Sequence, residues 1–262
     1  MNTSEFLNIT SLIVPDRTAI IFDGIRITYS DLALRVARLA NALRDMGVNS
    51  GDRIATMEVN CNEHIEAYFA AAKLDAIYVP INFRATESEL EYMLNDSSPT
   101  VVLAGSRYTD MIERISVKVE SLKELIVIDG SAEGWHTYDQ IVSSALDDEM
   151  FPESDDDDLT MLMFTAGTTG FPKGVMLSHD SFSSYILSNV SPPDMEVEEK
   201  NILTVPLYHI AGVQAVMAAI YGGRTLIIQR QFEPVEWMTL VEQEKANRAM
   251  MVPTMLKMIL DH

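Results

Sequence analysis

The chain has 262 residues, of which 47% are hydrophobic and 22% are charged, and its formal net charge is −20. This composition is typical of a globular protein, and the length suffices for one large domain or two small ones with a sizeable core. The acidic balance argues against a general binder of nucleic acids or of anionic membranes.

Signals for export or membrane anchoring are missing from the sequence. Its one cysteine, Cys61, excludes an intrachain disulfide and fits a reducing compartment. The N-terminus has no basic stretch followed by an apolar one, and no apolar run reaches membrane-spanning length. We therefore expect a cytoplasmic protein without a stable membrane anchor.

Helical and strand patterns alternate through the first half of the chain. Ser30 is expected to cap a helix that closes at Gly47, and Thr86 with Glu89 predicts a capping box for a helix to about Asn95. A further helix is predicted over residues 62–74. Strands are predicted at residues 53–59, 77–81, 100–104 and 125–129. This alternation predicts an α/β fold with mostly parallel, layered sheets and flanking helices.

An acidic run, residues 153–158, separates the two halves. Because it contains little apolar surface, we interpret it as a solvated connector, with a metal-binding tract as the alternative. The expected division is a first α/β subdomain over residues 1–152 and a second over residues 159–262. No residue is assigned as a metal ligand.

The second half shows the same alternation. Strands are predicted at residues 159–164, 202–205, 225–228 and 249–252, and helices at residues 209–221, 235–244 and 253–262. Another helix is expected from about Asp180, capped by Ser178. The last predicted helix is apolar and has no stop signal, so we expect the chain to be a fragment of a longer protein.

A loop rich in glycine and threonine follows the strand predicted at residues 159–164. Its candidate binding residues are Thr165, Ala166, Gly167, Thr168, Thr169, Gly170 and Lys173. Glycine lets backbone N–H groups approach an anion, threonine adds hydroxyl donors, and lysine adds positive charge, which together suit phosphates. A Walker A loop is excluded because Pro172 precedes the lysine and Gly174 follows it, and no G-x-G-x-x-G fingerprint is present.

The loop resembles the phosphate-binding signature of the adenylate-forming superfamily, which includes acyl-CoA synthetases, luciferases and peptide-synthetase adenylation domains. Ala166 stands where that signature usually has serine, so we expect weaker phosphate contact at this position. Residues 27–32 and 72–82 resemble further segments of the superfamily in the same order. Asp75 replaces the usual glycine of the second segment, so that turn is expected to differ.

Residues 206–212, Pro-Leu-Tyr-His-Ile-Ala-Gly, resemble a motif of acyl- and aryl-CoA synthetases. The resemblance implies that His209 lies beside the acyl substrate, where it either orients the carboxylate or gates access; a capping or core histidine is the alternative. Residues 206–214 contain no acidic side chain to hold a substrate ammonium, which disfavours an amino-acid substrate. The small residues Ala211, Gly212, Ala215, Ala218 and Ala219 leave room for an acyl chain or for close helix packing.

The resemblance covers nearly the whole chain but only about the first half of the family's length. It implies the N-terminal part of an ATP-dependent acyl-CoA synthetase that uses ATP, Mg²⁺ and coenzyme A to activate a carboxylic acid, with a medium- or long-chain fatty acid expected. An aryl-acid CoA ligase and a non-catalytic nucleotide-binding module stay open as alternatives. Since the family's other nucleotide-binding segments would follow His262, we expect the 262 residues alone to be inactive and to self-associate through an exposed apolar face.

Overall fold

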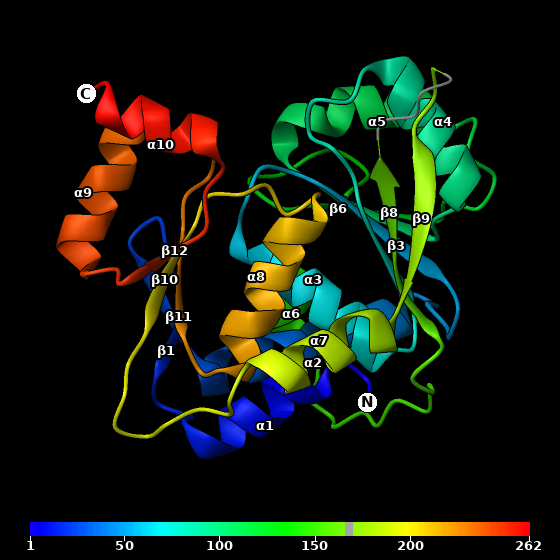
Figure 1. The fold of residues 1–262 in the computed structure, drawn as a ribbon. Helices are drawn as coiled ribbons and strands as arrows, with labels where there is room; N and C mark the ends of the chain where they lie inside the picture. Colours follow the sequence, from blue (N-terminus) through cyan, green and yellow to red (C-terminus); the bar gives the residue numbers. More distant parts are fainter. Residues whose placement is uncertain (166–169) are drawn as a thin grey trace. The chain divides into compact units, whose positions relative to one another are not determined.

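The computed structural model describes residues 1–165 and 170–262. It confirms the expected α/β fold, in which mostly parallel sheets are flanked by helices (Figure 1). The chain groups into two compact units, each built from separate stretches of sequence. Unit 1 comprises Met1–Ser4, Leu34–Glu58 and Glu66–Ser181, and unit 2 comprises Glu5–Ala33, Val59–Ile65 and Phe182–His262. Within the described residues, every helix is too short or too polar to cross a lipid bilayer.

Among the described residues, unit 1 contains a seven-stranded sheet with the order β7-β6-β5-β3-β4-β8-β9. The strands are β3 (Arg53–Met57), β4 (Ile77–Pro80), β5 (Val101–Ala104), β6 (Glu124–Val127), β7 (His136–Thr137), β8 (Leu159–Thr165) and β9 (Lys173–Ser178). Neighbouring strands are parallel except β8 and β9, which form an antiparallel hairpin at one edge. Strands β5, β3 and β4 are almost entirely buried, as expected for a parallel sheet covered by helices.

Two helices cover one face of this sheet, α4 (Glu87–Ser97) and α5 (Thr109–Ser116). Their apolar side chains, including Leu90, Met93 and Ile112, join strand residues in one hydrophobic cluster. The predicted capping box at the start of α4 is confirmed: Thr86 N–H donates to Glu89 Oε2 over 2.8 Å, and Thr86 Oγ1 accepts from Glu89 N–H. A further helix of unit 1 is α6 (Tyr138–Ser144).

Unit 2 contains, in its described residues, a five-stranded sheet with the order β12-β10-β11-β1-β2. The strands are β1 (Thr18–Phe22), β2 (Ile25–Thr28), β10 (Lys200–Leu203), β11 (Thr225–Ile228) and β12 (Arg248–Ala249). Only the β1–β2 hairpin is antiparallel, and its two turn residues, Asp23 and Gly24, both have positive φ.

The helices of unit 2 are α1 (Glu5–Ile13), α8 (Ile210–Tyr221), α9 (Pro234–Glu244) and α10 (Pro253–Leu260). Helix α1 packs against α8, where Phe6 contacts the ring of Tyr221 at a centroid distance of 5.1 Å. Helix α9 packs Trp237, Leu240 and Val241 against the β1–β10–β11 strands. Helices α2 (Tyr29–Asp45), α3 (Asn62–Lys73) and α7 (His179–Asn189) contain residues of both units.

Two local predictions need comment. The prediction that Ser30 caps α2 is wrong: the helix begins at Tyr29, and Thr28 Oγ1 accepts the hydrogen bond from Asp31 N–H at 3.1 Å. The predicted cap of α7 is confirmed, because Ser178 Oγ accepts from Ser181 N–H at 3.3 Å. The division at residues 153–158 stays a prediction; in the contact grouping those residues belong to unit 1.

Candidate functional site

The β8–β9 hairpin carries the predicted phosphate-binding loop. Thr165 is the last residue of β8, and it pairs with Lys173, the first residue of β9. Thr165 Oγ1 donates to Lys173 O at 3.4 Å, which closes the loop. Because β8 runs parallel to β4, its last residue, Thr165, lies at the carboxyl end of parallel strands, the edge where parallel α/β sheets bind ligands (Figure 1). The loop residues Ala166, Gly167, Thr168 and Thr169 lie outside the described residues.

The described part of the loop leaves a positive charge available. Gly170 has φ +106°, a conformation that strains any residue with a Cβ. The next residue, Phe171, stacks on Tyr92 of α4 with a centroid distance of 4.8 Å, which attaches the loop to the body of unit 1. Lys173 is exposed, and no carboxylate among the described residues forms an ion pair with it. In a chain with net charge −20, an exposed lysine of this kind suits an anionic ligand.

The base of this hairpin is fixed by backbone hydrogen bonds to the acidic run. Leu159 of β8 pairs with Ser178 of β9. Just beyond this pair, His179 N–H donates to Asp158 O at 3.0 Å, and Asp180 N–H donates to Asp156 O at 2.8 Å. The acidic run therefore has a structural role in unit 1, at the end of the hairpin opposite to Thr165 and Lys173.

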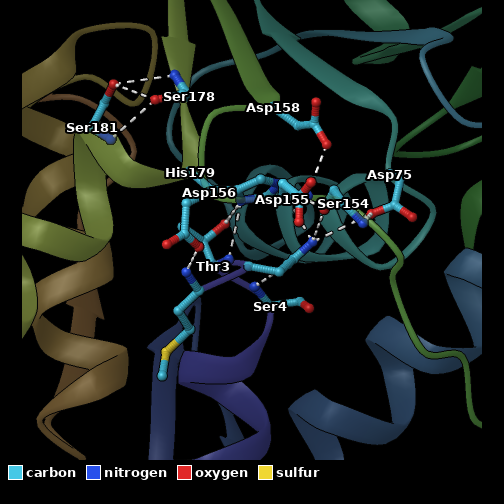
Figure 2. Close-up of polar contacts among 12 residues, drawn as sticks. Thr3, Ser4, Asp75, Ser154, Asp155, Asp156, Asp158, Ser178, His179 and Ser181 are labelled. Atoms are coloured by element: carbon cyan, nitrogen blue, oxygen red, sulfur yellow. Dashed lines mark hydrogen bonds and ion pairs between the residues drawn. The ribbon is translucent and has the colours of Figure 1, made fainter.

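A buried histidine extends this anchor to the N-terminal segment. His179 is 1% exposed, and its Nδ1 accepts a hydrogen bond from Thr3 N–H at 3.1 Å. Its Nε2 lies 3.4 Å from Asn2 Nδ2 and 3.4 Å from Ser154 Oγ (Figure 2). Burial lowers the pKa of His179 to about 4, although the nearby carboxylates of Asp75 and Asp158 favour the protonated form. The ring is therefore neutral at pH 7.

Asp75 has φ +53°, a left-handed conformation that favours glycine. Its carboxylate accepts hydrogen bonds from Glu153 N–H at 2.7 Å and from Ser154 N–H at 3.2 Å. The aspartate thus adds contacts to the acidic run that a glycine lacks. The expectation that this turn differs from that of the family stays a prediction; an aspartate tolerates positive φ better than most residues.

Acid is expected to destabilise the protein through His179. Because its folded pKa of about 4 lies below the ordinary value of 6.5, its contribution is fully present above pH 6.5 and declines as the pH falls towards 4. The loss amounts to about 2–3 kcal/mol. Chemical denaturation of His179→Gln at several pH values should show a shallower pH dependence than the wild-type chain.

The matched control for this experiment is His136→Gln, since His136 is 44% exposed and pairs with Glu124 at the surface. This control should keep the wild-type pH dependence between pH 6.5 and 4. Equal slopes for His179→Gln and the wild type would show that His179 contributes nothing to acid sensitivity.

His209, the predicted catalytic residue, belongs to unit 2 and occupies the N-cap position of α8. Its ring is solvent-accessible and lies 4.3 Å from the ring of Tyr208, measured between centroids. Partial desolvation lowers its pKa below the usual value, which favours the neutral imidazole. Its side chain makes no capping hydrogen bond among the described residues, so the capping alternative is not supported. The structure thus brings Thr165, Gly170 and Lys173 together in unit 1 and places His209 in unit 2.

One residue near His209 was not found from the sequence. Asn60 is 2% exposed and binds the backbone of the segment that leads to His209. The sequence offers no signal for this contact, because the partners are separated by about half the chain.

Two curated proteins are similar to this chain over most of its length. The chain is 33% identical over 251 residues to a feruloyl-CoA synthase of Amycolatopsis sp, an alignment that covers 95% of the chain and 48% of the relative. It is 32% identical over 235 residues to the long-chain-fatty-acid–CoA ligase FadD13 of Mycobacterium tuberculosis, covering 88% of the chain and 45% of that protein. The chain thus spans about half the length of the curated relatives it matches.

Among solved structures, ATP-bound MatB from Rhodopseudomonas palustris is similar, with a TM-score of 0.86 and 28% sequence identity. The match covers 100% of this chain and 52% of that one. Residues 13–262 match the family described as AMP-binding enzyme. Because this match spans nearly its whole length, the chain belongs to the AMP-binding enzyme family.

Proposed function

We propose that this chain is the N-terminal part of an ATP-dependent acyl-CoA synthetase that activates a medium- or long-chain fatty acid. In this reaction a carboxylate oxygen of the acid bonds to the α-phosphorus of ATP, and the bond to pyrophosphate breaks. The thiol of coenzyme A then displaces AMP and leaves a thioester. Relatives with acyl-CoA ligase names, at about one-third identity, support this proposal.

The observation that carries the proposal is the β8–β9 hairpin with Lys173 opposite Thr165. Backbone N–H groups, threonine hydroxyls and an ammonium without an ion pair among the described residues suit the β- and γ-phosphates of ATP. Lys173 would neutralise negative charge as pyrophosphate leaves, which is stabilisation by a preorganised donor. The ATP bound to MatB, a similar structure, supports the choice of nucleotide.

Mg²⁺ is proposed to enter with the phosphates of the nucleotide. Within the described residues, no three His, Cys, Asp or Glu side chains gather closely enough to hold a metal ion. We assign no side chain of this chain as a Mg²⁺ ligand, and coenzyme A is assigned none either.

His209 is proposed to lie beside the carboxylic acid, where a neutral imidazole orients the carboxylate or gates the path of the thiol. The lack of an acidic residue in 206–214 supports a substrate without an ammonium group. An aryl-acid CoA ligase is the second candidate, and the feruloyl-CoA synthase relative favours it. A non-catalytic nucleotide-binding module is the alternative that a complete lack of turnover would support.

Replacing Lys173 with methionine is expected to slow acid-dependent ATP–pyrophosphate exchange by about 100-fold, because the charge next to the leaving phosphates is lost. Since the chain spans about half the length of its curated relatives, the assay uses the protein as its gene encodes it and, in parallel, the 262-residue chain. A panel of fatty acids of increasing length and of aromatic acids separates the two candidate substrates.

Lys118→Met is the matched control, because it removes the same charge from an exposed lysine of unit 1 that pairs with Glu91. It should retain the wild-type exchange rate. Equal exchange rates in the Lys173 and Lys118 variants would show that Lys173 does not act at the phosphate site. If no acid of the panel supports ATP–pyrophosphate exchange, the synthetase proposal is wrong.

We also propose a cytoplasmic location and self-association of the 262-residue chain. Cys61 is the one cysteine of the chain and is buried, which supports a reducing compartment. Exposed apolar side chains on α10, namely Leu256, Met258 and Leu260, support association through this helix. Light scattering across a range of protein concentrations measures the self-association.

A further inference from the structure

Asn60 lies in the stretch Val59–Ile65 of unit 2, and its side chain is 2% exposed. Its amide nitrogen donates to Val205 O at 3.2 Å and to Gln229 O at 3.2 Å. Its amide oxygen accepts from Leu207 N–H at 2.9 Å. Both donor hydrogens and the acceptor oxygen of the side chain are therefore used on the backbone.

These partners lie at the carboxyl ends of two adjacent parallel strands. Val205 follows β10, and Gln229 directly follows β11. Asn60 N–H also donates to Arg230 O at 3.2 Å, one residue further along. A single buried residue thus joins two strand ends, and through Leu207 it joins them to the turn that enters α8.

The turn itself is compact. His209 N–H donates to Pro206 O at 3.1 Å, and Gly212 N–H donates to His209 O at 3.0 Å. A Cβ added at Gly212 would lie only 2.4 Å from Pro206 O, so the first turn of α8 packs directly on the turn backbone. Leu207 is two residues from His209, and few backbone torsions separate the Asn60 contact from the imidazole.

We propose that Asn60 is a positioning residue for His209, holding the turn of residues 205–209 in the orientation that presents the imidazole at the carboxyl ends of β10 and β11. This inference deepens the proposed function and rests on it, since it assigns the orientation of the residue proposed to meet the carboxylic acid.

The chemistry of the contact requires an amide. An alanine leaves two carbonyl groups and one N–H unpaired in a buried place. An aspartate accepts from Leu207 N–H, but its ionised form faces two carbonyl oxygens with no hydrogen to donate. The carboxyl introduced by Asn60→Asp should therefore have a raised pKa, and below that pKa its proton satisfies one carbonyl. If Asn60→Ala fails to fold, Asn60→Asp should still fold at pH values below the pKa of its introduced carboxyl.

The first arm of the test uses the 262-residue chain and follows the His209 ring by NMR, with the signal assigned through His209→Gln. In Asn60→Ala and Asn60→Asp, we expect the pKa of His209 to rise towards its ordinary value, since a loosened turn exposes the ring to water. The amide of Leu207 should exchange faster in both variants.

Asn189→Asp is the matched control, because exposed Asn189 makes one side-chain hydrogen bond, to Tyr185 O of its own helix. It should leave the His209 titration at the wild-type value. Folded Asn60 variants with unchanged His209 titration and unchanged Leu207 exchange would overturn the positioning role.

The second arm measures turnover in the protein used for the Lys173 assay. Asn60→Asp should lower kcat by about tenfold, the loss expected from a misplaced reacting group, with KM for ATP unchanged. If His209→Ala lowers turnover and Asn60→Asp does not, the positioning role is overturned. If His209→Ala leaves turnover unchanged, the proposed role of His209 fails, and the NMR arm alone decides whether Asn60 positions it.

Discussion

Replacing Gly212 with alanine is expected to destabilise the protein by about 3 kcal/mol, the upper range for overpacking a tightly packed site. An alanine inside a helix normally stabilises it relative to glycine, so the sign of this prediction depends on local space. The added Cβ would lie 2.4 Å from Pro206 O, 2.9 Å from Pro206 C and 3.1 Å from Val205 O. These are backbone atoms, which relax less readily than the end of a side chain.

The strain should also reach His209, because Pro206 O accepts the hydrogen bond from His209 N–H. Denaturant unfolding measures the stability, and amide exchange at His209 measures the local effect. Gly174→Ala is the control: its Cβ would meet Leu162 Cδ1 at 3.0 Å, a side-chain end that can rotate, so the change should stay within about 1 kcal/mol. An unfolding midpoint for Gly212→Ala at or above the wild-type value would contradict the packing argument.

Local signals predicted much of the fold. The capping box of Thr86 and Glu89 and the cap at Ser178 depend on contacts within one helical turn, and both are confirmed. The buried strand β11 matches its predicted range, residues 225–228, because a short apolar run bounded by polar residues indicates a strand without knowledge of its neighbours.

Two elements were not predicted from the sequence. The β1–β2 hairpin has a local signal, because Asp23-Gly24 between two short apolar runs is typical of a hairpin turn. Strand β9 has none: four of its six residues are exposed, so its sequence shows no alternation, and its pairing with β8 defines it. Ser30 and Thr28 both offer a capping hydroxyl, and the position of β2 decides for Thr28.

The candidate site also combines residues that a local motif identifies with a residue that no local pattern identifies. Thr165, Gly170 and Lys173 are close in sequence, so a motif finds them, and the hairpin then explains why the lysine faces the end of β8. Asn60 and Leu207 are 147 residues apart, and their contact forms only in the folded chain. A side chain that acts on distant backbone leaves no local pattern, which is why sequence reasoning did not identify Asn60.

Replacing Arg35 with methionine is expected to destabilise the protein by about 3–5 kcal/mol, because it removes the cation from a buried carboxylate. Glu66 of α3 is 0% exposed, and its Oε1 lies 2.9 Å from Arg35 Nε of α2. Its other oxygen accepts from the hydroxyl of Tyr138, on α6, at 2.7 Å. Arg35 is 30% exposed, so its guanidinium contacts the buried carboxylate while part of the side chain stays in contact with water. Denaturant unfolding at pH 7 measures the change.

Arg44→Met on the same helix is the control, since it removes an ion pair with Asp45 at 3.8 Å between exposed side chains and a hydrogen bond to Asn41 Oδ1 at 2.7 Å, but strips no buried carboxylate of its cation; the loss should be about 1–2 kcal/mol. The double variant Arg35→Met with Glu66→Leu separates the two possible causes of a large loss. If the loss comes from an unpaired buried charge, the double variant should be more stable than Arg35→Met alone, because neither charge is left inside. If the loss comes from missing contacts of the arginine side chain, the second substitution should lower stability further.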